Sequence, residues 1–246
     1  MGEKTNNAFI AIGLMLFALF FGAGNLIFPV FMGQNAGVNT IPATIGFLIT
    51  GVGLPLLGVL AICYSDEKLS ELEGRIHPAY SIFFCTALYL TIGPFFAAPR
   101  TATVAYAIAV AQYLPPDLLR MGLYVFAAVF FIITWWLAIS PCRLGAGVGK
   151  LMAPVLLVFL FLLIISAIAS PMGSWQAPAA AHDTGAKAFG QGIVDGYNTM
   201  DGLAALVFGI IVVESVKMYG AVSEAEITKD RLRSGLIATF FMALTY

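Results

Sequence analysis

Long runs of hydrophobic residues alternate along this chain with short polar or Pro/Gly-rich joints. A helix needs about 20 mainly apolar residues to cross the roughly 30 Å hydrocarbon core of a bilayer. Six runs reach that length, and a seventh is cut short by the end of the sequence. We predict one all-α membrane domain, residues 1–246, with helices near 8–31, 42–63, 79–113, 121–139, 148–169, 188–213 and the truncated 236–246.

The composition supports a membrane location and excludes several classes of function. Hydrophobic residues make up 60% of the chain and charged residues 10%, against about 45–50% and about 25% in soluble domains. A net charge of -1 gives no basic excess for binding nucleic acid. The three cysteines show no CxxC spacing, so neither a disulfide framework nor a transition-metal site is predicted. No organic cofactor is indicated.

The segment 79–113 is too long for an upright crossing, since at about 1.5 Å per residue it would extend about 50 Å. It is either one tilted helix or two short ones. Lys and Arg collect on the cytoplasmic side of membranes, and one helix, kinked near Pro94 and Pro99, leaves only Arg120 and Lys187 outside. The N-terminus is then cytoplasmic, on the same side as Lys4, Lys68, Arg75, Arg143, Lys150, Lys217, Lys229, Arg231 and Arg233.

The first apolar segment contains an unusual stretch, FFGAGNLIFP, from Phe20 to Pro29. Glycine weakens a helix, and Pro29 has no amide to offer the carbonyl of Asn25. Carbonyls freed at membrane depth need a protein-lined cavity or a cation. We therefore predict an interruption at Gly22–Asn25, with a simple kink or a small-residue packing site as the alternative.

The sixth segment carries a polar interruption, DGYNTMDG, from Asp195 to Gly202. Asn198, Thr199 and Asp201 fall near the bilayer centre, where an Asp costs about 2.5–3.5 kcal/mol. A hairpin of two short helices, with Asp201 capping the second, is the alternative. Each apolar flank is much shorter than a span, which favours one broken helix with a functional site at Tyr197–Asp201.

The two interruptions occupy equivalent positions if the fold repeats after five helices. Because five is odd, the second copy enters the membrane from the opposite face. Interrupted helices at matching positions of inverted repeats indicate the midplane site of a secondary transporter. There, half-helix amides can hold a substrate carboxylate and unwound carbonyls a sodium ion. Asn25, Asn198, Thr199 and Asp201 supply the oxygen ligands that such a cation prefers.

Three stretches resemble the bacterial branched-chain amino acid:cation symporters. They are FALFFGAGNLIFP near the start, GPFFAAPRTATV from Gly93 to Val104, and GYNTMD followed by VFGI from Gly196 to Ile210. The resemblance runs the length of the chain. It implies the N-terminal part of a five-plus-five inverted-repeat transporter fold with broken helices 1 and 6, the fold of the amino acid, polyamine and organocation carriers.

The resemblance also implies a function: uptake of leucine, isoleucine and valine across the bacterial cytoplasmic (inner) membrane, coupled to sodium or protons. In carriers of this fold the site forms at the breaks of helices one and six. The substrate-binding residues would be Phe21, Gly22, Ala23, Gly24, Asn25, Tyr197, Asn198 and Thr199. The cation-binding or coupling residues would be Ala23, Asn25, Thr199 and Asp201. The chain departs from the family at Ala107, often acidic, and at Asn198, often aliphatic.

Arg100 is a further charge expected inside the membrane. It lies too deep along its helix for easy snorkelling, so we expect it to be a structural charge with an ion-pair or carbonyl partner. A gating or substrate-contact role is the alternative. His77 and His182 are expected to be solvated loop residues.

Two other classes of function remain in view. A channel also has broken helices and midplane polar groups, but it usually shows symmetric pore rings. An intramembrane enzyme would need a nucleophile and base or a pair of acids, and Asp201 has no second carboxylate or His predicted beside it. The expected partners are branched-chain amino acids and the lipid bilayer. The sequence does not specify an oligomeric state.

Overall fold

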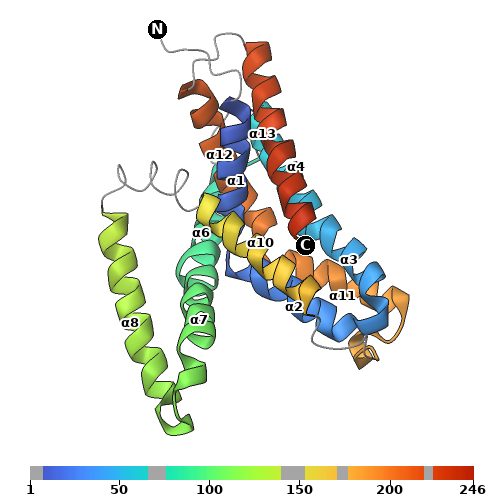
Figure 1. Cartoon of the computed structure of the whole chain (residues 1–246). Coiled ribbons are helices and arrows are strands. Elements are labelled where there is room, and N and C mark those ends of the chain that lie inside the picture. The colour runs from blue at the N-terminus through green and yellow to red at the C-terminus, as the bar shows by residue number, and fades with distance from the viewer. Residues whose placement is uncertain (1–7, 66–75, 140–152, 171–176, 219–223) are drawn as a thin grey trace.

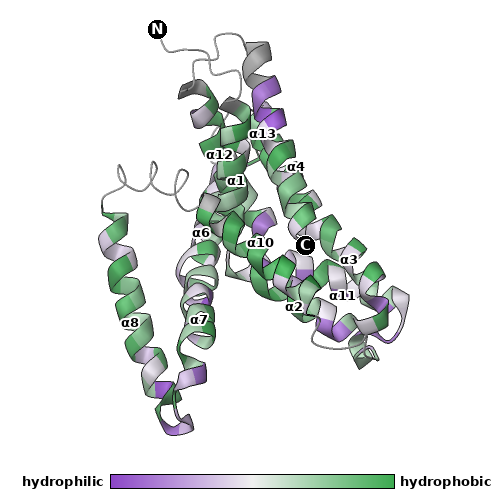
Figure 2. Cartoon of the chain, in the orientation of Figure 1, coloured by the Kyte–Doolittle hydropathy of each residue, from purple (hydrophilic) through white to green (hydrophobic). Residues whose placement is uncertain are grey.

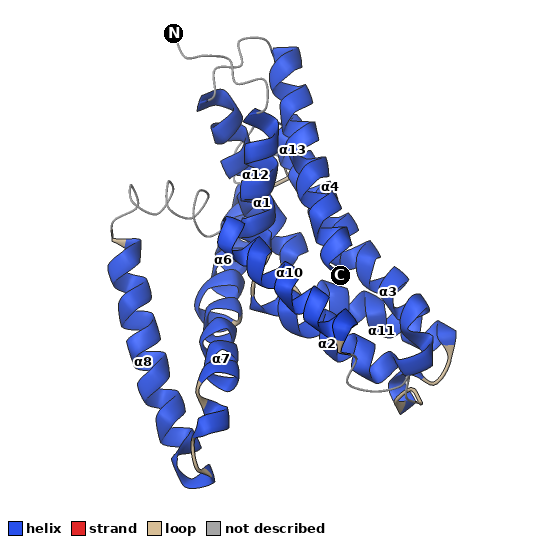
Figure 3. Cartoon of the chain, in the orientation of Figure 1, coloured by secondary structure: helices blue, strands red, loops and turns tan. Residues whose placement is uncertain are grey.

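The computed structural model describes residues 8–65, 76–139, 153–170, 177–218 and 224–246. All regular secondary structure in these ranges is helical (Figure 3). Three continuous helical runs are long and apolar enough to cross a membrane: Ala23–Tyr64, Pro78–Tyr113 and Pro116–Ala138. A bent pair, Gly185–Tyr197 with Asp201–Val216, passes the same test when taken together. The chain is therefore an all-α, multi-pass membrane protein.

The first predicted segment consists of two helices, α1 (Ala8–Phe20) and α2 (Ala23–Ala36). Only Phe21 and Gly22 lie outside them, so the interruption comes earlier than the predicted Gly22–Asn25. The segment also ends later than the predicted residue 31. Pro29 lies inside α2 without ending it, because proline removes one backbone hydrogen bond and the rest of the helix can still be held by packing.

A tight turn, η1 (Gly37–Asn39), leads into the second membrane helix. Gly37 has φ 49° there, a conformation that glycine adopts without steric cost. The helix then runs through α3 (Thr40–Leu48), a π-helical turn η2 (Ile49–Gly53), and α4 (Leu54–Ser65). The prediction placed it at 42–63.

The long third segment forms one continuous run of helical elements. It comprises α6 (Pro78–Leu90), the π-helical turn η3 (Thr91–Phe95), α7 (Ala97–Ala109) and η4 (Ala111–Tyr113). Gly93, next to Pro94, has a non-helical ψ of -115° and marks the kink. After η5 (Pro116–Leu118), α8 (Leu119–Ala138) returns beside α7 (Figure 1). The segment Pro78–Tyr113 is thus one helical run with a kink; its tilt in a membrane stays a prediction.

The second half contains α10 (Ala153–Ala169), η7 (Ala180–His182), α11 (Gly185–Tyr197), α12 (Asp201–Met218) and α13 (Glu224–Thr245). Residues 148–152, predicted to begin the fifth helix, lie outside the described residues. The sixth helix was predicted at 188–213 and the seventh at 236–246; both begin earlier. Hydrophobicity marks the part of a helix in lipid, whereas backbone hydrogen bonds continue through charged residues.

The start of α13 carries charges that we had placed in a loop. Lys229, Arg231 and Arg233 lie within this helix, where the turns that follow its grey first part are hydrophilic in Figure 2. Arg231 is buried and donates from Nη1 to the carbonyl of Cys63 at 3.0 Å. Outside the described residues are Lys4, Lys68, Arg75, Arg143 and Lys150.

The helices around the breaks pack as two groups, and each broken segment has one half in either group. In one group α1 and α12 pack together with α4 and α13; in the other α2 and α11 pack together with α3. The core of the first group includes Ile12, Leu16, Phe17, Val59, Ile62, Ala205, Val212 and Met242. The core of the second includes Met32, Ala36, Ala43, Phe47 and Ala188. Each broken segment thus contributes one half-helix to each group.

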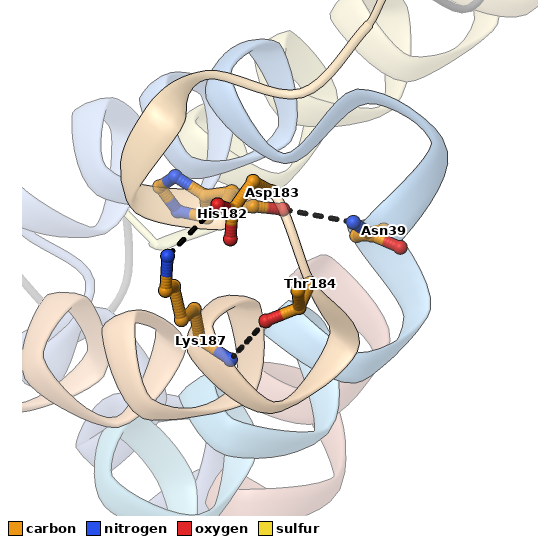
Figure 4. A network of polar contacts seen from close by, with 5 residues as sticks. All are labelled: Asn39, His182, Asp183, Thr184 and Lys187. Carbon is orange, nitrogen blue, oxygen red and sulfur yellow. Dashed lines mark hydrogen bonds and ion pairs between the residues drawn. The ribbon is translucent and has the colours of Figure 1, made fainter.

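The beginning of α11 is held by a polar network (Figure 4). Asn39 Nδ2 donates to the carbonyl of His182 at 2.8 Å, and Lys187 Nζ donates to Asp183 Oδ2 at 2.8 Å. The second bond holds the pKa of the Asp183 carboxyl below its usual value. His182 is buried, with 4% of its surface exposed, so the expectation of a solvated histidine is wrong. Packing of η7 against α2 and α11 covers the side chain.

Candidate functional site

The first break lies between α1 and α2, and Gly22, the residue before α2, has an extended backbone. Gly22 has φ -109° and ψ -170°, and no side chain caps the new helix. A gap between two helices leaves carbonyls at the end of the first and amides at the start of the second without helical partners. The amino end of α2 also carries the positive end of a helix dipole. The break therefore offers donors to an anion and acceptors to a cation.

The second break separates α11 from α12 by Asn198, Thr199 and Met200. Met200 has φ 67°, a left-handed conformation that costs a non-glycine residue roughly 1–2 kcal/mol. The two helices are bent by 40° at this break. Asp201 is the first residue of α12, where the helix dipole stabilises a carboxylate. We had predicted an interruption from Tyr197 to Asp201; those two residues are the helical ends that flank it.

The two breaks meet through a hydrogen bond between Asn25 and Asp201. Asn25 Nδ2 donates to Asp201 Oδ2 at 2.6 Å, across 176 positions of sequence. Both side chains are buried, with 4% and 3% of their surfaces exposed. An amide that donates to a carboxylate forms a charge-assisted bond, which is stronger than a neutral one. Asp201 thus has the partner that its position in the membrane requires.

Arg100 of α7 also contacts the second break, through two backbone carbonyls. Its Nη1 donates to the carbonyl of Asn198 at 2.7 Å and its Nη2 to the carbonyl of Thr199 at 3.3 Å. The guanidinium also lies 5.4 Å from the ring centroid of Phe28 in α2, within range of a cation–π contact. We had expected Arg100 to have either an ion-pair partner or carbonyl partners, and it has carbonyl partners.

Gly24 lets Arg100 come close to the first break. A Cβ built on Gly24 would lie 2.9 Å from Arg100 Nη2 and 3.4 Å from the Cα of Thr199. A side chain at this position would push the guanidinium away. The amino end of α2, the guanidinium of Arg100 and the carbonyls of the second break therefore lie close together.

The predicted site residues differ in their exposure. We call the place where the two breaks meet the crossing. Five of the predicted site residues are buried there: Phe21, Gly24, Asn25, Thr199 and Asp201. Ala23 is half-buried, and Gly22, Tyr197 and Asn198 are exposed. Tyr197 has 53% of its surface exposed, and no described contact brings it to the Asn25–Asp201 pair. Of the predicted site residues, the structure therefore buries the polar side chains of Asn25, Thr199 and Asp201 where the two breaks meet, and leaves Tyr197 exposed.

Sequence reasoning missed Tyr246. Its hydroxyl accepts from Asn25 Nδ2 at 2.5 Å and donates to Asp201 Oδ2 at 3.2 Å. The only hint of this role in the sequence is that a tyrosine follows the apolar run of α13. A tyrosine in that position is equally typical of an aromatic residue at the membrane interface. Only the packing of α13 against α1 and α4 brings it to the breaks.

Two glycines that we did not single out fix the position of α11. A Cβ on Gly192 would overlap the carbonyl oxygen of Ala43, and a Cβ on Gly196 would overlap that of Phe47. Their spacing of four residues places both on one face, as in the small-residue motifs of membrane helices. Thr50 adds a hydrogen bond of 2.7 Å to the carbonyl of Ile193. The second break is thereby held against α3 and η2.

A second buried carboxylate, Asp195, was also overlooked. It lies on α11 and accepts from Gln191 Nε2 at 3.3 Å. The crossing itself contains Asp201, an amide, a phenol and a guanidinium, without a described nucleophile and base in contact. Such a set can hold a small zwitterion and a cation by charge and hydrogen bonds.

Comparison with known proteins agrees with this description. A family profile described as branched-chain amino acid transport protein matches residues 5–246. The branched-chain amino acid permease BrnQ of Bacillus subtilis is 43% identical over 248 residues, covering 100% of this chain and 56% of the permease. BrnQ of Lactobacillus delbrueckii is 40% identical over 249 residues, with 100% and 56% covered. The permease BraB of Bacillus subtilis is 41% identical over 237 residues, with 96% and 53% covered.

The chain spans about half the length of these curated relatives. No solved structure matches it. The relatives are named permeases, and the family is one of transport proteins rather than enzymes. Since the family profile covers nearly the whole sequence, this chain belongs to the branched-chain amino acid transport protein family.

Proposed function

We propose that the carrier containing this chain takes up leucine, isoleucine and valine by symport with sodium or protons. The proposal rests on one observation: the hydrogen bond of 2.6 Å between Asn25 and Asp201, which joins two helix breaks from opposite ends of the chain. Broken helices that meet at membrane depth are how secondary transporters build a midplane site. The substrate names of the relatives, branched-chain amino acids, supply the chemical class.

The pairing of half-helices supports an inverted repeat. The chain runs from α1 to α2 and from α11 to α12, while α1 packs with α12 and α2 packs with α11. The first half of one broken segment therefore lies beside the second half of the other. That arrangement is expected if the sixth helix is the inverted counterpart of the first, in a five-plus-five fold.

The substrate carboxylate would bind at the amino end of α2. Ala23 and Gly24 are the first residues of α2, and the first amides of a helix have no helical partner and carry the positive end of its dipole. Arg100 lies close enough to Gly24 to add a second positive contribution. The substrate ammonium would then face the side of Asp201 and the carbonyl ends of α1 and α11. The remaining substrate-binding residues would be Phe21, Gly22, Asn25, Tyr197, Asn198 and Thr199.

The coupling cation would bind at Asp201, with oxygens from Asn25, Thr199 and the backbone at Ala23. Hard oxygen ligands suit sodium, and a carboxylate can also carry a proton. Alternating access would follow from rocking of one helix group against the other around this crossing. The protein would lie in the bacterial cytoplasmic membrane, with its N-terminus inside.

Uptake of radiolabelled leucine, isoleucine and valine into vesicles tests this proposal. We expect concentrative uptake of all three when a sodium or proton gradient is present, and its loss when both gradients are collapsed. Alanine and lysine serve as non-substrates of different size and charge. Uptake that only equilibrates, whatever the gradient, would identify a channel and contradict the proposal.

A further inference from the structure

The hydroxyl of Tyr246 has no role in the mechanism proposed above, yet it contacts both breaks. It accepts from Asn25 in α2 at 2.5 Å and donates to Asp201 in α12 at 3.2 Å. Its ring packs edge-on against Phe47 of α3, with centroids 5.0 Å apart and planes at 78°. The side chain is thereby held by contacts at both its ring and its hydroxyl.

These contacts favour one of the two orientations of the Asn25 amide. An amide nitrogen carries two N–H donors and no acceptor. Asn25 uses Nδ2 for both bonds, to Asp201 at 2.6 Å and to Tyr246 at 2.5 Å. The amide oxygen therefore points away from the carboxylate. A half-turn of the amide would exchange the two atoms and present the oxygen to Asp201.

That exchange would change what the pair can bind. With the nitrogen inward, an N–H donor lies beside the carboxylate. With the oxygen inward, an amide oxygen, the carboxylate and a lone pair of the Tyr246 hydroxyl would converge on one point. Three oxygen atoms, one of them charged, are the donor set that an alkali cation prefers. The phenol can accept there because its own proton goes to Asp201.

We propose that Tyr246 is a positioning residue for sodium coupling: it orients the Asn25 amide beside Asp201 and adds an oxygen when that amide turns. This inference rests on the proposed symport and narrows its coupling ion to sodium. The hydroxyl should therefore set the response of the carrier to sodium. It should have little effect on recognition of the amino acid, which lies toward Gly24 and Arg100.

The test is Tyr246→Phe in the full-length carrier, reconstituted in proteoliposomes. Phenylalanine keeps the ring contact with Phe47 and removes the oxygen. We expect the sodium concentration for half-maximal leucine uptake to rise about 3- to 10-fold, the effect of losing one hydrogen-bond-strength contact. The leucine KM at saturating sodium should stay within about 2-fold, because no contact to the amino acid is lost.

Tyr106→Phe is the matched control. Tyr106 donates to the carbonyl of Leu119 at 2.6 Å, between α7 and α8, so its loss removes an equivalent hydrogen bond away from the crossing. Its sodium activation should equal that of the wild type. Unchanged activation in Tyr246→Phe, or an equal rise in its leucine KM, would overturn the inference.

The wild-type arm separates this inference from the proposed function. Uptake driven by a proton gradient and indifferent to sodium would overturn the sodium assignment and leave symport intact. Wild-type uptake that follows neither gradient would overturn both. Thermal unfolding of the purified protein gives a readout without transport, since ligands stabilise the folded state they bind. Sodium chloride, compared with choline chloride, should stabilise Tyr246→Phe less than the wild type, while leucine stabilises both equally.

Discussion

Asp201 is the residue on which charge balance at the crossing depends. It is buried at the start of α12 and hydrogen-bonded to Asn25 and Tyr246. A carboxylate that receives two donors is the strongest acceptor the site offers a cation. Its charge, more than its shape, should therefore matter for coupling.

Asp201→Asn should reduce gradient-driven leucine uptake in the full-length carrier by roughly 10- to 100-fold. Hydrogen bonds to charged groups contribute about 1.5–3 kcal/mol, which corresponds to that range. The amount of protein inserted in the membrane should not change, since the amide is the smaller polar burden in lipid. Glu214→Gln is the control, because Glu214 is an exposed acid on the same helix. Wild-type transport kinetics in Asp201→Asn would remove this residue from the mechanism.

Gly24→Leu should abolish leucine binding. The first carbon of the new side chain would already stand 2.9 Å from Arg100 Nη2, so the guanidinium and the amino end of α2 would be forced apart. Gly33→Leu is the matched control, since a Cβ on Gly33 meets no atom within 4 Å on the same helix. Equilibrium binding of labelled leucine to the purified carrier measures the effect. If Gly24→Leu retained wild-type affinity, the first break would not be part of the substrate site.

The residues at the two breaks could be named from the sequence because each violates a local rule. Glycine, asparagine and aspartate in the middle of an apolar run are costly in lipid wherever they occur. Their partners could not be named in the same way. Arg100 could be expected to have a partner, but the sequence does not say that it binds the carbonyls of Asn198 and Thr199.

Among the elements, α11 has the most tightly constrained position. Gly192 and Gly196 lie against the backbone of α3, and Gly46 of α3 lies against the carbonyl of Phe189 in return. Contacts between backbones leave no room for adjustment by side-chain rotation. The second break is therefore held by one rigid pair of helices.

Gly192→Ala should destabilise the protein by about 1–3 kcal/mol, the usual cost of forcing a methyl group into a packed interior. The new Cβ would overlap the carbonyl oxygen of Ala43. Gly190→Ala, on the same helix with nothing within 4 Å of its Cβ, should be neutral or slightly stabilising, since alanine favours a helix. Thermal unfolding in detergent distinguishes the two. Equal unfolding temperatures would show that α3 and α11 are not in backbone contact.

The helical nature of the apolar segments was predictable from the sequence, and the ends of the described helices were not. The long run at 79–113 is a single kinked series of helices because Gly93 and Pro94 bend the chain without reversing it. The starts of α11 and α13 were placed too late. Thr184 caps α11 by accepting a hydrogen bond from the amide of Lys187 at 3.4 Å. The start of this helix is therefore set by a capping residue, and a search for apolar runs does not detect it.

At the scale of the whole molecule, the described loops between helices gather at one end. The turn between α7 and α8 and the beginning of α11 lie at the end opposite the beginning of α13 (Figure 1). Arg120 and Lys187 belong to this end, and both are exposed. If the N-terminus is cytoplasmic, this end faces outward.

Cysteine labelling tests that orientation. In a functional variant without Cys63, Cys85 and Cys142, we expect Arg120→Cys and Lys187→Cys to react with a membrane-impermeant thiol reagent in intact cells. Positively charged loops stay inside, so Lys4→Cys should react only after permeabilisation. The reverse pattern would invert the proposed topology and leave the fold unchanged.

The sequence alone determined that this protein is a helical membrane protein, which stretches form the apolar parts of its helices, and which two segments are interrupted. Those features follow from a local requirement. A stretch of backbone in lipid must satisfy its own hydrogen bonds as a helix, and an interruption needs residues such as glycine or polar residues that stand out in an apolar run. The tertiary structure decided which groups meet at the breaks: Asn25 with Asp201 and Tyr246, and Arg100 with the carbonyls of the second break. Contacts across 176 and 221 positions depend on how whole helices pack, and no local pattern of residues encodes that.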